Sequence, residues 1–179
     1  RGAKHLIDPS RLMNSAMQAL SQGEMARYGL MSPIDREKVE VLEDSAAIEL
    51  SSQQRLKVIY TPGHANHHLC LYEERNKGLF AGDALGDCST GAEFVLLPDT
   101  PGPSFDLTLA LNSLERVKHL HLKILYLSHF GVSREVEEIL RVAEDKLKVW
   151  GDVVYQAMKD NPDDVVGNLK EFIYAELQP

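Results

Sequence analysis

The sequence predicts a mixed α/β fold, and two patterns support this prediction. Between Val39 and Asp83, apolar and polar residues alternate in short runs, which is typical of β-strands. After Asp106, apolar residues recur at helical spacing on both sides of one short apolar run, which indicates helix, strand and helix in succession. With 179 residues, of which 44% are hydrophobic, the chain can form one sizeable core. We therefore expect a single domain.

The N-terminal part predicts an amphipathic helix. Asp8 is a candidate N-cap, and Pro9 suits the first helical position. The apolar residues that follow have helical spacing: Leu12, Met13, Ala16, Met17 and Leu20. Methionine side chains are adaptable, so this surface is either ordinary core or the wall of a substrate pocket.

The middle of the chain predicts an antiparallel meander. Four apolar runs occupy residues 48–50, 55–60, 67–72 and 78–83, and polar turns separate them. Residues 84–103, "ALGDCSTGAEFVLLPDTPGP", are rich in Gly, Pro and Asp, and we expect them to form a long loop near a functional site.

The C-terminal half predicts an α/β crossover. A helix from Leu107 to Val117 precedes the buried strand "KILYLSHFG". Ser133 is a candidate cap for a long helix, and "NPDD" at residues 161–164 predicts the start of a last helix.

Composition excludes several classes of protein. The net charge is -8, from 27 acidic and 19 basic residues, which disfavours nucleic acid as a partner. No apolar run reaches the roughly 20 residues that span a bilayer, and no signal peptide is recognisable. Two cysteines, Cys70 and Cys88, give no disulfide framework. We expect a cytoplasmic protein that acts on a small molecule.

Three polar residues stand where predicted strands end. His64 follows the turn "TPG", Asp83 follows "LFAG", and His129 follows "ILYLS". Loops at strand ends converge while the strands hold them rigidly, so these side chains can meet in one site. Two imidazoles and a carboxylate are good ligands for zinc, iron or manganese. The alternative is that each residue simply closes its strand with satisfied hydrogen bonds.

The segments "TPGHANHHLCLY", "LFAGD" and "LYLSHFG", in this order, resemble the second half of the metallo-β-lactamase-fold hydrolases, which include glyoxalase II. The resemblance implies a four-layer αββα sandwich. It also implies that His64, Asp83 and His129 are metal ligands, with Asp83 bridging two divalent ions. Water activated by the metals would then attack an ester, thioester, amide or phosphodiester bond.

One departure from the family is large, because the motif His-x-His-x-Asp-His is absent. The "HLH" of residues 119–121 has only the first spacing, and we assign it to solvent or structure. We therefore expect residues 1–179 to be a partial domain without the N-terminal strands and the first metal motif, consistent with Arg1 in place of methionine. Such a domain would expose an apolar face, so we expect it to pair with another copy or with the missing segment.

The residues after His64 carry two more histidines. His68 matches a family histidine that is not usually a ligand, and we expect it to orient a ligand or pair strands. We expect the His67 side chain to face substrate or solvent. Cys88 has no second sulfur or histidine at ligand spacing, so we expect a packed side chain.

The resemblance favours a metal-dependent hydrolase of the glyoxalase II-like branch for the intact domain, with zinc as the expected metal and Asp83 as its catalytic residue. Residues 1–179 carry only part of the metal site, so we expect them to be inactive alone. The Met-rich helix and the loop after Asp83 would shape the pocket. Two alternatives stay open. One is an iron-dependent redox relative, such as a persulfide dioxygenase or flavodiiron-like protein. The other is a degenerate, non-catalytic domain that binds a ligand or partner without metal.

Overall fold

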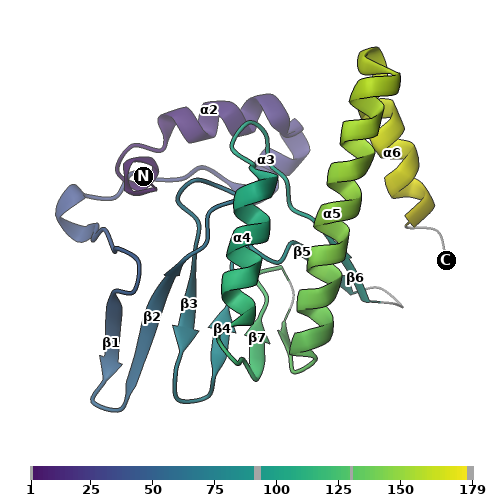
Figure 1. Ribbon diagram of the computed structural model, residues 1–179. Coiled ribbons are helices and arrows are strands. Elements are labelled where there is room, and N and C mark those ends of the chain that lie inside the picture. The colour runs from purple at the N-terminus through teal and green to yellow at the C-terminus, as the bar shows by residue number, and fades with distance from the viewer. Residues whose placement is uncertain (1, 91–93, 130, 177–179) are drawn as a thin grey trace. The chain divides into compact units, whose positions relative to one another are not determined.

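The computed structural model describes residues 2–90, 94–129 and 131–176. Its contacts divide the chain into two compact units, Arg1–Asp44 and Ser45–Pro179. Figure 1 traces both units from the N-terminus to the C-terminus. Among the described residues, no helix is both long enough and apolar enough to span a membrane.

The first unit is helical. It contains α1 (Ala3–Ile7), α2 (Ser10–Ala19), α3 (Gln22–Tyr28) and the 3-10 helix η1 (Arg36–Lys38). The single predicted helix is divided, because Ser21 starts α3 with a capping box: its hydroxyl accepts from the Glu24 amide, and the Glu24 carboxylate accepts from the Ser21 amide. Its main part, α2, starts one residue later than predicted, at Ser10, whose amide donates to the Asp8 carboxylate.

The second unit is built on a six-stranded sheet. The strands are β1 (Ala47–Ser51), β2 (Gln54–Tyr60), β3 (Leu69–Glu73), β4 (Gly78–Phe80), β7 (Ile124–Tyr126) and β8 (Val132–Ser133), in the order β1-β2-β3-β4-β7-β8. The first four form the predicted antiparallel meander. β4 and β7 are parallel, as the predicted crossover requires.

The prediction of a long loop over residues 84–103 was wrong in its middle. β5 (Asp87–Thr90) and β6 (Phe94–Leu97) form a separate antiparallel pair, and residues 91–93 lie outside the described residues. Because Gly, Pro and Asp residues lie at both ends of the segment, the apolar run 94–97 was not predicted to be a strand. Cys88 and Leu96 are partners in the register and are both buried, so this hairpin has an apolar face of its own.

Two helices, α4 (Leu107–Lys118) and α5 (Val136–Asp160), lie over one face of the large sheet (Figure 1). They are followed by η2 (Pro162–Asp164) and α6 (Val165–Glu176), and α6 packs against α5. The Asp106 carboxylate caps α4 by accepting from the Leu109 amide. The long helix begins after Glu135 instead of at Ser133, because Ser133 still belongs to β8; its hydroxyl accepts from the Glu135 amide.

The sheet carries apolar residues on both faces. Leu79 and Leu125 are fully buried in the core that includes residues of α4 and α5. Their neighbours Phe80 and Tyr126 point to the opposite face, where their rings stack with centroids 4.4 Å apart. Phe80 is 43% exposed and Val132 is 63% exposed. A sheet with two apolar faces is typical of the middle of a layered sandwich.

An ion pair links the two helices above the sheet. The Glu144 carboxylate on α5 accepts hydrogen bonds from Lys118 at the end of α4 and from Lys148 one turn further along α5. These two ammonium groups lower the pKa of Glu144 from its ordinary 4.5 to about 2.

We predict that Glu144→Gln lowers the free energy of unfolding by about 1 kcal/mol at pH 7. A carboxylate whose folded pKa is depressed stabilises the protein above its unfolded pKa, so the wild-type advantage should disappear as the pH falls from 4.5 to about 2. Urea unfolding over this pH range measures the effect. Glu137→Gln, on the exposed first turn of α5, is the matched control and should leave the pH profile unchanged. Equal profiles for the two variants would contradict the assigned ion pair.

Candidate metal centre

His64 is held by a turn that packs against the start of α4. The Asp106 amide donates to the Gly63 carbonyl at 2.9 Å, and the Ser113 hydroxyl donates to the Pro62 carbonyl at 2.6 Å. A Cβ atom on Gly63 would lie 2.4 Å from the backbone of Ala110, so only glycine permits this approach. The turn "TPG" therefore fixes the direction in which His64 leaves the end of β2.

Asp83 follows β4 and is held through its backbone. Its amide donates to His68 Nε2 at 2.9 Å. Gly82, between the strand and Asp83, has φ 53°, and a Cβ there would lie 2.5 Å from His68 Nε2. Glycine thus supplies both the left-handed backbone and the space for the imidazole.

His68 lies in the core as a neutral imidazole. Because Nε2 accepts from Asp83, the proton is on Nδ1, which lies 3.1 Å from the Thr61 carbonyl and 2.9 Å from its hydroxyl. Burial lowers the pKa of His68, which favours this neutral form. His68 therefore joins the backbone of Asp83 to Thr61 through its two ring nitrogens.

The carboxylate of Asp83 lies between two histidines. His64 Nε2 is 3.6 Å from Asp83 Oδ2, and His129 Nε2 is 3.2 Å from Asp83 Oδ1. The two carboxylate oxygens thus face different imidazoles. The structure brings together all three residues that the sequence predicted as ligands.

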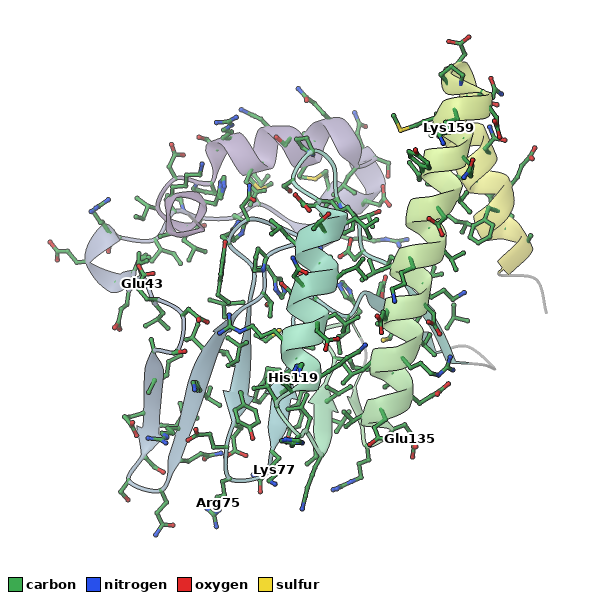
Figure 2. The ribbon with its side chains drawn as sticks, in the orientation of Figure 1. Glu43, Arg75, Lys77, His119, Glu135 and Lys159 are labelled. Atoms are coloured by element: carbon green, nitrogen blue, oxygen red, sulfur yellow. The ribbon has the colours of Figure 1, made fainter. Side chains whose placement is uncertain are left out.

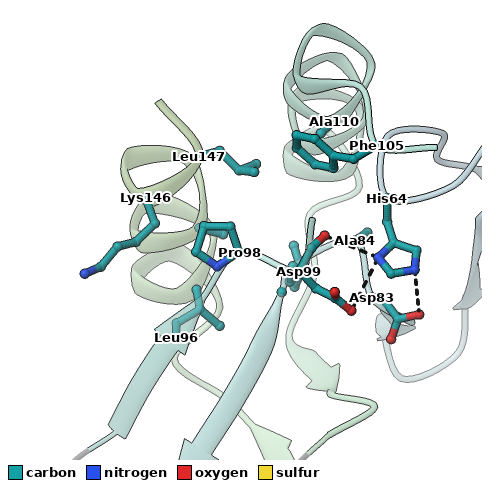
Figure 3. Close-up of a pocket in the computed structure, with 13 residues that line it drawn as sticks. His64, Asp83, Ala84, Leu96, Pro98, Asp99, Phe105, Ala110, Lys146 and Leu147 are labelled. Atoms are coloured by element: carbon teal, nitrogen blue, oxygen red, sulfur yellow. Dashed lines mark hydrogen bonds and ion pairs between the residues drawn. The ribbon is translucent and has the colours of Figure 1, made fainter. Parts of the chain in front are cut away.

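Asp99 is a further member of the site that the sequence analysis missed. His64 Nδ1 lies 3.4 Å from its carboxylate and 3.3 Å from its carbonyl oxygen (Figure 3). Within the described part of the chain, His64, Asp83 and Asp99 form a group whose ligand atoms lie within 4.8 Å of one another. Asp99 directly follows "FVLLP", so the only available signal was an aspartate after an apolar run, in a segment assigned to loop.

The donor set fits a divalent metal. In a tetrahedral zinc site, neighbouring ligand atoms are about 3.4 Å apart, since each lies about 2.0–2.1 Å from the ion. The separations between Asp83 and the two histidines, 3.6 and 3.2 Å, are close to this value. One imidazole binds an ion through one nitrogen. With Nε2 of His64 facing Asp83, Nδ1 is available to Asp99, the usual arrangement of a carboxylate that orients a metal-binding histidine.

Other candidate residues lie outside this group. His67 is exposed on the turn before β3. His119 follows the last residue of α4 and bonds the Glu115 carbonyl, at the same end of the fold as the turn residues Arg75 and Lys77 (Figure 2). Gly63, next to His64, is hydrogen-bonded to Asp106 at the opposite end of α4. A 12-residue helix is about 18 Å long, so His119 lies too far from His64 to belong to the site.

The two cysteines are buried free thiols. Burial raises the pKa of Cys70 to about 12, and burial together with Asp87 raises that of Cys88 to about 11. Both thiols stay protonated near neutral pH, so neither is a reactive thiolate.

Comparison with known proteins identifies the family. The family model of the metallo-beta-lactamase superfamily matches residues 1–129 of the chain. The chain belongs to this superfamily, whose members generally bind divalent metals. The predicted α/β fold class is confirmed.

Relatives of several kinds are similar to parts of the chain. The metallo-beta-lactamase fold-containing protein ST1585 of Sulfurisphaera tokodaii is 33% identical over 122 residues, which are 68% of this chain and 44% of ST1585. The crystal structure of ST1585 superposes with a TM-score of 0.65 at 29% identity, over 83% of this chain and 54% of that chain. The chain therefore spans about half the length of this relative.

Some relatives carry names of enzymes. A hydroxyacylglutathione hydrolase of Francisella philomiragia is 36% identical over 59 residues, 33% of this chain and 23% of its own length. The atrochrysone carboxyl ACP thioesterase of Aspergillus fumigatus is 26% identical over 92 residues, 51% of this chain and 25% of its own length.

The contact between Gly82 and His68 predicts the effect of an added methyl group. Gly82→Ala should cost about 1 kcal/mol for the left-handed backbone and about 1–3 kcal/mol more for the clash with the imidazole. Displacement of Asp83 should also weaken zinc binding at least tenfold. Thermal unfolding and zinc titration measure the two effects.

Gly29→Ala is the matched control. Gly29 also has a positive φ, 74°, but a Cβ there meets nothing within 4 Å. This variant should show the backbone cost alone and keep its zinc affinity. If both variants lose the same stability and bind zinc equally, the contact with His68 does not position Asp83.

Proposed function

We propose that this chain supplies His64, Asp83 and His129 to the metal centre of a hydrolase that cleaves ester or thioester bonds. The observation that carries the proposal is the placement of the Asp83 carboxylate, whose two oxygens face two different histidines at 3.6 and 3.2 Å. This is the arrangement expected of a carboxylate that bridges two ions.

The expected cofactors are two divalent metal ions. Imidazole and carboxylate ligands suit zinc, and also iron or manganese. A bound divalent ion supplies two kinds of chemistry: it lowers the pKa of a coordinated water and polarises a substrate carbonyl. Since three residues are few for two ions, we infer that further ligands come from outside residues 1–179 or from a second copy.

The residues of the chain have separate roles in this proposal. Asp83 holds its negative charge between the two histidines. His68 fixes its backbone, and Asp99 orients the ring of His64 through Nδ1. In hydrolysis, water adds to the substrate carbonyl, the C–O or C–S bond breaks, and an acid and an alcohol or thiol leave.

Two relatives support the ester and thioester class. One is named a hydroxyacylglutathione hydrolase and the other an ACP thioesterase. These matches cover only 33% and 51% of the chain, so the assignment to the glyoxalase II-like branch is itself a proposal.

We also infer that the exposed face of the sheet binds a further layer of the domain or another copy of the chain. Phe80, 43% exposed, and Val132, 63% exposed, lie on neighbouring positions of β4 and β8, on either side of β7. Covering them would remove apolar surface from water.

We predict that the chain retains at least one equivalent of zinc, iron or manganese after exposure to each metal and gel filtration. Asp83→Ala should lose this metal, because it removes the carboxylate that both histidines face. Elemental mass spectrometry measures the content. His119→Ala removes a histidine outside the site and should retain the wild-type amount.

The same experiment separates the alternatives. Ester or thioester hydrolysis with the bound metal supports the proposed reaction. Selective retention of iron with consumption of oxygen, and no hydrolysis, would favour a redox relative. If no metal is retained even when the ligands expected from outside residues 1–179 are supplied, the enzymatic proposals fail and a non-catalytic domain is favoured.

A further inference from the structure

A second, larger cavity lies between α4, α5, α6 and the segment after β6. Its volume is about 420 Å³, within the range of about 300–1,000 Å³ that is usual for small-molecule sites. Most of its wall is apolar, and the described lining includes Pro98, Phe105, Leu107, Leu147, Trp150 and Val154.

The cavity shares part of its wall with a small space beside the metal centre. A small space of about 10 Å³, roughly one water-sized sphere, is bounded by His64 and Asp83. Pro98, Phe105 and Leu147 line both spaces. Figure 3 shows these three side chains beside Asp99 and His64. In the sequence, Asp99 lies between two residues of the large cavity wall, Pro98 and Thr100.

We propose that the large cavity binds the acyl chain of the substrate, so that the enzyme acts on esters or thioesters of medium-chain aliphatic acids. This inference rests on the proposed function, because it places the substrate carbonyl at the His64–Asp83 pair. The shared wall puts the two sites next to each other, as a substrate that occupies both would require.

The chemistry of the wall excludes charged substituents. No charged side chain belongs to the lining that the structure describes, so a buried charge there would lose its hydration without a partner. Tyr155, 55% exposed, and Met158, 60% exposed, border the cavity on its solvent side. Methionine adapts to flexible chains, and aromatic rings cover them with large apolar surfaces.

The first test measures binding of neutral chains, which need no metal. Trp150 is the single tryptophan of the chain and lines the cavity, so its fluorescence reports occupancy. In titrations with 1-butanol, 1-hexanol and 1-octanol, each added methylene should tighten binding about fourfold, equivalent to ~0.8 kcal/mol per buried CH₂. Affinity that does not depend on chain length would overturn the proposal.

Val154→Phe fills the cavity and should weaken octanol binding at least tenfold. Val149→Phe is the matched control: it places the same side chain on an exposed position of α5, Val149 being 42% exposed, and should bind as wild type. If Val154→Phe does not fold, Met158→Ser tests the same wall at an exposed position and should weaken octanol binding at least threefold. Wild-type affinity in the folded cavity variants would contradict the assignment.

The second test uses hydrolysis in the presence of zinc by the protein with its full set of metal ligands, including those expected from outside residues 1–179. Ethyl octanoate and octyl acetate are isomers, and each yields one acid and one alcohol. The proposal predicts at least tenfold higher kcat/KM for ethyl octanoate than for octyl acetate or ethyl acetate. Val154→Phe should lower the ratio of ethyl octanoate to ethyl acetate at least tenfold, and Val149→Phe should keep it.

The outcomes separate the two proposals. Hydrolysis of all esters without chain preference overturns the acyl cavity alone, and preference for octyl acetate overturns the assignment to the acyl side. Length-dependent binding of alkanols without hydrolysis of any ester supports the apolar specificity of the cavity and counts against the proposed reaction.

Discussion

The site depends on one buried imidazole that joins three strand ends. His68 stands at the start of β3, contacts Thr61 at the end of β2, and accepts the amide of Asp83 after β4. Both ring nitrogens are engaged, so the ring cannot turn without breaking a hydrogen bond in the core. Gly82 permits this contact, because no other residue offers the same space and backbone conformation. The position of the Asp83 carboxylate is thus fixed from inside the fold.

The same principle applies to His64, which is fixed by a helix. The turn before it is bonded to Asp106 and Ser113 of the α4 region and packs against the helix backbone. His129 follows β7, the strand that pairs with β4 in parallel. Three side chains that are distant in sequence therefore converge, because each leaves an element whose packing is determined by the core. Binding groups held in this way need little reorganisation when a ligand arrives.

Much of this arrangement was predictable from local patterns. The meander follows from apolar runs separated by polar turns, and the crossover follows from helical spacing beside a buried strand. The convergence of His64, Asp83 and His129 follows from their positions at strand ends. Asp99 was not predictable in the same way, because its role depends on the β5–β6 hairpin, whose apolar run 94–97 is enclosed by turn-forming residues. The apolar cavity could not be predicted from the sequence either, because helical spacing alone does not say which side of α5 faces a cavity. The resemblance gave the family, and tertiary contacts gave the partners of each ligand.

We propose that Asp83 holds metal between His64 and His129. Anomalous diffraction from zinc-soaked crystals, recorded above and below the zinc absorption edge, tests this most directly. We predict a peak about 2.0–2.2 Å from Asp83 and from at least one of the two histidine Nε2 atoms. Crystals of Asp83→Ala, soaked in the same way, should lack this peak. Zinc bound elsewhere, with no peak at Asp83 in the wild type, would contradict the account.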